Sequence, residues 1–148
     1  ETNLQTINKT MLEAYDLVSN LPVIDKKKIF AYGRSIGGGA AALLAKQRPL
    51  SALGLESTFS SFPKLVSEKG FPSFVLADRY ENEDILKELD IPIFIYHGLN
   101  DKLIPFTHAE SLVNAGKDVT FYQESCGHNN CPRKWNELLG FLKQNSLN

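Results

Sequence analysis

Short apolar runs, each followed by a helix-like segment, recur along this chain of 148 residues. The runs at 29–32, 51–55, 91–96 and 119–122 have the length of buried strands. Strands that alternate with helices are joined by crossover connections, and such connections pair strands in parallel. The alternation therefore predicts an α/β fold with a mostly parallel sheet flanked by helices.

The segments between these runs carry helical signals. Residues 4–18 place apolar side chains every three or four positions, and 40–46 consist almost entirely of good helix formers. We expect two further helices at 107–115 and 135–142. Residues 58–90 are less regular and hold prolines and several aromatics, so we expect short helices in a cap-like insertion there. The length suits a single domain over residues 1–148.

Charge excludes one class of function. Sixteen Lys and Arg residues against seventeen Asp and Glu residues give a formal net charge of −1, and nucleic-acid binding normally needs a clustered basic surface. Lys26–Lys28 form one basic run, which predicts a solvated turn. A contact with an anionic membrane is the alternative, but lipid-binding patches usually need about four to eight basic residues. No apolar stretch is long enough to span a bilayer.

The first strand ends in Gly33–Gly37, which reads G-x-S-x-G between a strand and a helix. A serine on so tight a turn takes a strained backbone conformation, and the glycines on either side let the chain segments pass closely. Such a turn exposes the Ser35 hydroxyl and aims the N–H of Ile36 at the position of an oxyanion. A loop that only packs helix against strand is the plainer alternative. A dinucleotide or phosphate loop fits less well, because Ser35 replaces the middle glycine and no Gly-Lys-Ser/Thr follows.

A serine hydroxyl needs a base that an acid orients. Of the three histidines, His97 closes a strand and is expected to shape a turn, while His108 begins a helix and is expected to be exposed. His128 lies in a loop before the last helix and is free to reach Ser35. Asp101, directly after the most hydrophobic strand, is the candidate acid.

These segments together resemble the serine α/β-hydrolase superfamily, in which the order along the chain is also Ser, Asp, His. Two further segments, Glu56–Ser61 and Asp78–Tyr80, are similar to a branch of acyl esterases, thioesterases and S9/S33-peptidase-like hydrolases that includes eukaryotic protein depalmitoylases. The motifs that carry the resemblance are Gly33–Gly38, His97-Gly98 with Asp101 and Pro105, and Gly127-His128.

The resemblance implies a function and its machinery. Ser35 would attack an acyl carbonyl, His128 would act as the base, Asp101 would orient it, and the Ile36 N–H would bind the oxyanion. The implied substrate is a small-molecule or lipid acyl ester or thioester, with no metal or organic cofactor. Two other interpretations of the sequence stay open. The chain could be a non-catalytic interaction or regulatory module, or a nucleotide-binding domain.

The resemblance covers only the C-terminal portion of the family's domain, with its N-terminal strands absent. The family's second oxyanion donor lies in that earlier part, so we expect a fragment of weak activity. The unpaired edge of the strand Ile29–Tyr32 would then form a homodimer or bind the missing N-terminal segment of the same protein.

Aromatic residues in the insertion offer candidate substrate contacts. Phe59, Phe62 and Phe74 would line an acyl pocket, or else form plain core.

Two cysteines, Cys126 and Cys131, bracket His128. We expect free thiols. A disulfide that stiffens the loop is one alternative, and a metal site with His128 is another, although zinc sites usually need closer pairing of their ligands.

Overall fold

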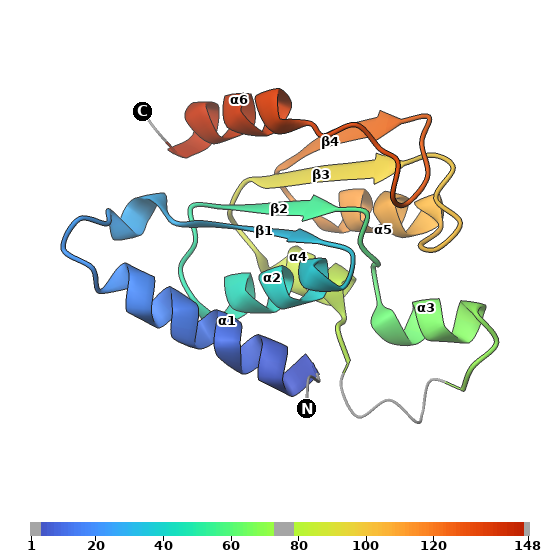
Figure 1. Ribbon diagram of the computed structural model, residues 1–148, viewed down its shortest axis with the longest axis horizontal. Helices are drawn as coiled ribbons and strands as arrows, with labels where there is room; N and C mark the ends of the chain where they lie inside the picture. Colours follow the sequence, from blue (N-terminus) through green and yellow to red (C-terminus); the bar gives the residue numbers. More distant parts are fainter. Residues whose placement is uncertain (1–3, 73–78, 147–148) are drawn as a thin grey trace.

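The computed structural model describes residues 4–72 and 79–146. Within them, four strands form one sheet in the order β1-β2-β3-β4, and every neighbouring pair is parallel. This confirms the predicted fold class (Figure 1). The strands are β1 (Phe30–Arg34), β2 (Ala52–Glu56), β3 (Ile93–Gly98) and β4 (Val119–Glu124).

Helices cover both faces of this sheet. In Figure 1, α1, α2, α4 and α5 lie on one face and α6 lies on the other. The helices are α1 (Leu4–Ser19), α2 (Ile36–Gln47), α3 (Phe62–Glu68), α4 (Asn82–Glu88), α5 (Phe106–Ala115) and α6 (Trp135–Ser146).

Alternation along the central strands divides the core between the two faces. Leu53 and Leu55 of β2 pack with the large cluster on the α2 side, whereas Ala52 packs with α6. In β3, Ile95 packs with the large cluster on the α2 side, and Phe94 packs on the α6 side. Because side chains alternate between faces, strands buried on both faces read as continuous apolar runs, which is why the sequence reveals them.

Residues 58–90 form two different structures. α3 lies at the carboxyl end of the sheet, but α4 places Ile85 and Leu86 in the main core. The part after Tyr80 therefore adds a short helix to the layer that covers one face of the sheet. Phe74 lies outside the described residues.

The basic run Lys26–Lys28 is a short 3₁₀ helix, η1, whose three side chains are exposed and whose first turn Asp25 caps. This agrees with the predicted solvated turn. Across residues 4–72 and 79–146, no helix is both long and apolar enough to cross a membrane.

Candidate active site

Ser35 occupies the turn between β1 and α2 in a strained conformation, with φ 54° and ψ −124°. This lies in the positive-φ region that L-residues avoid. A Cβ on Gly33 would come within 2.2 Å of the Gly37 carbonyl oxygen, so this position must be glycine. A Cβ on Gly37 would meet nothing within 4 Å, which corrects the expectation that both glycines are needed for close passage.

Thr58 supports this turn from the neighbouring strand end. Its hydroxyl donates a 2.7 Å hydrogen bond to the carbonyl of Ser35, and its side chain is buried. A Cβ on Gly38 would lie 2.4 Å from the Thr58 Oγ1, so glycine at 38 leaves the space that Thr58 fills. No local sequence pattern marks this role of Thr58, because it depends on the contact between the end of β2 and the start of α2.

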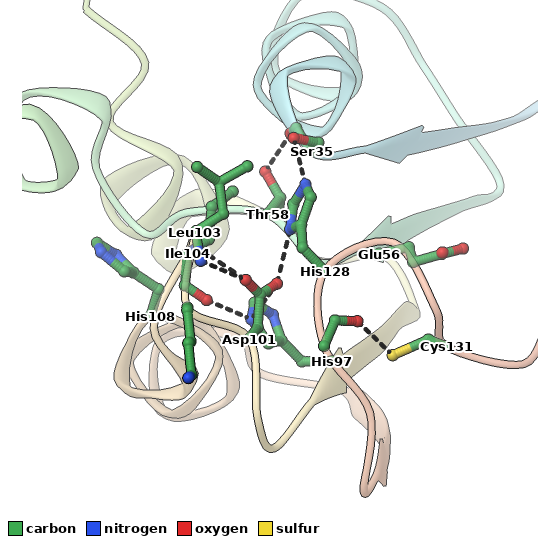
Figure 2. A network of polar contacts seen from close by, with 12 residues as sticks. Ser35, Glu56, Thr58, His97, Asp101, Leu103, Ile104, His108, His128 and Cys131 are labelled. Carbon is green, nitrogen blue, oxygen red and sulfur yellow. Dashed lines mark hydrogen bonds and ion pairs between the residues drawn. The ribbon is translucent and has the colours of Figure 1, made fainter.

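The structure brings Ser35, His128 and Asp101 together in one hydrogen-bonded series (Figure 2). The Ser35 Oγ lies 3.0 Å from the His128 Nε2, and the His128 Nδ1 lies 2.7 Å from the Asp101 Oδ2. The three residues come from the ends of β1 and β3 and from the loop after β4. With Nδ1–H donating to the carboxylate, Nε2 is left to accept the serine proton.

Asp101 is fixed by its own backbone surroundings. Its other oxygen, Oδ1, accepts 2.9 Å hydrogen bonds from the N–H groups of Leu103 and Ile104. Its carboxylate is fully buried, and these two donors stabilise its charge there. The turn therefore leaves Oδ2 aimed at His128.

His97 supports the same turn, as the sequence predicts. Its Nε2 donates to the Ile104 carbonyl at 2.9 Å and lies 3.5 Å from the Asp101 Oδ2. Burial lowers the pKa of His97 below its ordinary value. A neutral imidazole thus closes the loop that carries the candidate acid.

His108 is fully buried, so the expectation that it is exposed is wrong. Its Nδ1 accepts a 3.1 Å hydrogen bond from the Ser60 N–H, and its Nε2 lies 3.0 Å from the Glu68 carboxylate. Since Nδ1 accepts, the proton is on Nε2. Desolvation lowers the pKa of His108, against the opposing influence of Glu68. The imidazole joins α5, α3 and the loop after β2, a long-range contact without a local sequence signal.

Ile36 is the first residue of α2, and its side chain is 39% exposed. The N–H groups of a helix's first turn have no acceptor within the helix. This donor therefore lies next to Ser35, at the positive end of the helix dipole, where an oxyanion would be stabilised.

The two described candidate substrate residues differ in exposure. Phe59 is 1% exposed and packs with Ala40, Tyr80 and Ile104, which is the core role that the sequence left open. Phe62 is half-buried beside it, with ring centroids 5.2 Å apart.

Cys126 and Cys131 form a disulfide around His128, so the expectation of free thiols is wrong. The two cysteines are five residues apart in the chain. Within the loop between them, the Gly127 N–H donates a 2.6 Å hydrogen bond to the Asn130 side chain. Disulfide sulfurs are not thiolate ligands, so the alternative metal site has lost two of its three donors. Within the described ranges, no cluster of three or more His, Cys, Asp or Glu side chains could hold a metal ion.

A buried ionic cluster that no local sequence pattern reveals lies beside this loop. Glu56, the last residue of β2, is 2% exposed, and its carboxylate accepts hydrogen bonds from Tyr32, Arg34 and Arg133. Desolvation, followed by the contact with Glu56, raises the pKa of the Tyr32 hydroxyl. The phenol therefore stays protonated and donates to the carboxylate.

Comparisons with known proteins show which sequences and folds this chain is similar to. No protein-family model matches the chain. It is 31% identical over 126 residues to the "Alpha/beta hydrolase domain-containing protein WAV2" of Arabidopsis thaliana, an alignment covering 73% of the chain and 41% of the relative. It is 28% identical to "Protein bem46" of Schizosaccharomyces pombe, covering 100% of the chain and 53% of that protein. The chain thus spans about half the length of the curated relatives it matches.

Solved structures share the fold at low identity. Acetyl xylan esterase 1 from Thermoanaerobacterium sp. matches with a TM-score of 0.73 at 17% identity, over 93% of this chain and 51% of that one. Zea mays acyl-protein thioesterase 2 matches with a TM-score of 0.61 at 19% identity, over 95% of this chain and 65% of that one. The chain thus has the α/β-hydrolase fold and is similar in sequence to a protein named for an α/β-hydrolase domain.

Proposed function

We propose that this chain carries the catalytic residues of a serine hydrolase that cleaves acyl esters or thioesters. The observation that carries the proposal is the pair of hydrogen bonds on His128, 3.0 Å to the Ser35 hydroxyl and 2.7 Å to the Asp101 carboxylate. The first distance is within the range at which a general base takes a proton from a nucleophile, and the second is within hydrogen-bond reach of the acid that orients this base.

In the proposed reaction, Ser35 Oγ attacks the acyl carbonyl carbon while its proton passes to Nε2 of His128. Asp101 stabilises the imidazolium that forms, and the Ile36 N–H donates to the oxyanion. Collapse of the tetrahedral intermediate expels the alcohol or thiol, which takes the proton from His128. Water, activated by the same imidazole, then releases the acid and restores Ser35.

Exposed apolar side chains near these residues support an acyl substrate. Ile36, next to Ser35, is 39% exposed, and Leu103, two residues after Asp101, is 53% exposed. Apolar surface of this kind suits the hydrocarbon part of a small-molecule or lipid ester. Phe62 offers a further half-buried ring beyond Thr58 in the chain.

We also propose that the 148-residue chain hydrolyses esters only slowly. Ile36 is the one backbone donor that we assign to the oxyanion. An oxyanion site short of one donor loses about 10²–10³ in rate. We therefore propose that the chain labels with reactive probes more readily than it turns over esters.

A fluorophosphonate probe tests the proposal. We expect labelling at Ser35 that is abolished in Ser35→Ala and strongly slowed in Asp101→Asn, which disturbs the tautomer of His128. A series of p-nitrophenyl esters of increasing length then measures the preference for the acyl chain.

Ser57→Ala is the matched control. Ser57 also follows a strand and has a positive φ of 46°, but its hydroxyl is buried and has no hydrogen-bond partner among the described residues. This variant should label like the wild type. Absence of labelling in the folded wild type would reject the hydrolase and favour the non-catalytic module.

A further inference from the structure

The backbone of His128 is held by an arginine next to the candidate nucleophile. The Arg34 guanidinium donates through Nη2 to the carbonyl oxygen of His128, and also to the Asn129 side chain at 3.1 Å. Arg34 occupies the variable position before Ser35 in the G-x-S-x-G turn. One side chain thus links the turn that carries the serine to the loop that carries the imidazole.

The guanidinium is itself oriented by the buried carboxylate of Glu56. Arg34 Nε donates to the buried Glu56 Oε1 at 3.0 Å, while Nη2 of the same guanidinium donates to the His128 carbonyl. The rigid, planar fork of arginine fixes both directions at once. Glu56 is 2% exposed, whereas the Arg34 side chain is 29% exposed, so the carboxylate is the fixed end of the link.

Two other contacts hold the ends of this loop. The disulfide joins Cys126 to Cys131, and the Tyr96 hydroxyl donates to the Pro132 carbonyl at 2.9 Å. Arg133 also pairs with Glu56, but it follows the disulfide in the chain and, among the described residues, forms no hydrogen bond with His128. Among the described residues, the side chain that bonds to the His128 main chain is that of Arg34.

From these contacts we propose that Glu56 is a positioning residue, which acts through Arg34 to set where the His128 imidazole stands between Ser35 and Asp101. This rests on the proposed hydrolase function. Glu56 touches none of the reacting groups with its side chain, which points away from Ser35 and Asp101 (Figure 2). Its backbone carbonyl accepts from the Ser35 N–H at 2.9 Å, a contact that side-chain substitution leaves in place.

Removing the charge of Glu56 releases Arg34 without altering the three reacting side chains. Without its ionic partner, the guanidinium gains freedom to turn towards solvent, and the His128 carbonyl loses its donor. Displacements of about 1 Å in catalytic groups cost up to about 10²-fold in rate. We therefore expect Glu56→Gln to slow fluorophosphonate labelling of Ser35 by about 10- to 100-fold.

The test compares Glu56→Gln with two other variants of the 148-residue chain. Arg34→Lys keeps the charge opposite Glu56 but lacks the second nitrogen that reaches His128, so it should slow labelling as well. Arg133→Met removes the other arginine of Glu56 and leaves the link to His128 intact, so it should label at the wild-type rate. Circular dichroism verifies that each variant is folded, and Arg34→Lys serves if Glu56→Gln does not fold.

A second readout does not depend on catalysis. The proton shared by His128 Nδ1 and Asp101 should give a downfield proton resonance, assigned by its loss in Asp101→Asn. We expect this resonance to shift or broaden in Glu56→Gln and Arg34→Lys and to stay unchanged in Arg133→Met. If the wild type is not labelled but the two variants show these spectral changes, the hydrolase function is rejected and the positioning role is supported.

Two results overturn the positioning role. One is an unchanged resonance and labelling rate in folded Glu56→Gln or Arg34→Lys. The other is an Arg133→Met variant as impaired as Glu56→Gln, because the cluster would then act only as a general anchor of the loop.

Discussion

At the scale of single residues, the neutral imidazole of His108 makes the stability of the fold depend on pH. Burial lowers its pKa below the ordinary value of 6.5, despite the adjacent Glu68, while Lys64 and Lys69 lower it further. Between these two pKa values the unfolded chain binds more protons than the folded one, so stability rises with pH. Stability should be complete above about pH 7 and fall as the pH drops through about 6.5, by at most about 1.4 kcal/mol per pH unit for this group.

Urea unfolding between pH 5 and 8 measures this dependence (the range over which histidine titrates is about this wide). His97 contributes in the same direction, because burial also lowers its pKa. In His108→Gln the amide can still accept from Ser60 and donate to Glu68 but does not titrate. The variant should lose part of the slope, and an unchanged slope would show that His108 does not supply it.

Residues of the site differ in how far the sequence reveals them. Ser35, Asp101 and His128 follow strands or precede a helix in short recognisable strings, so local pattern and chain order are enough to select them. Glu56 and His108 act through partners that lie 22 to 77 positions away in the chain. No local pattern carries such contacts, and burial of a charged or titratable side chain is visible only once the elements are packed.

At the scale of elements, the loop between β4 and α6 is the part of the site with the least regular structure. Its disulfide closes a ring of six residues around His128. The chain-entropy model gives about 2 kcal/mol for a loop of this size. We therefore expect the double variant Cys126→Ser/Cys131→Ser to lose about 2 kcal/mol of unfolding free energy and to label more slowly at Ser35.

Denaturant unfolding and labelling with and without reductant measure this effect. The wild type under reductant should match the double variant, and the double variant should not respond to reductant. If thiol titration of the unfolded, unreduced wild type finds two free thiols, the disulfide and this expectation are both wrong.

Element bounds show what apolar patterning can and cannot predict. The apolar runs locate all four strands, but β1 continues through Arg34 and β4 through Glu124, where the residues are polar. These extensions are set by pairing, since Arg34 is opposite Glu56 and Gly98 is opposite Glu124. The carboxyl ends of the strands, where substrate would bind in the proposed reaction, therefore consist of polar residues that an apolar pattern does not identify as strand.

At the scale of the whole molecule, β1 forms an edge of the described sheet. An apolar groove of about 270 Å³ runs beside it between α1, α2 and β1, and Phe30 is 41% exposed there. A strand edge with unpaired backbone groups and apolar neighbours pairs readily with another strand. We therefore propose that a second copy of this chain pairs along β1 and covers the groove.

Sedimentation velocity over a range of protein concentrations tests this association. The wild type should shift from monomer to dimer, while Phe30→Lys, which places a charge at the edge, should remain monomeric. Leu99→Lys is the matched control, because Leu99 is 42% exposed directly after β3, a strand that β2 separates from β1. This variant should dimerise like the wild type. A wild type that stays monomeric throughout would exclude pairing through β1, because the unpaired edge would then be tolerated. A Leu99→Lys variant that dissociates as Phe30→Lys does would exclude it too, because the contact between the copies would then not be specific to β1.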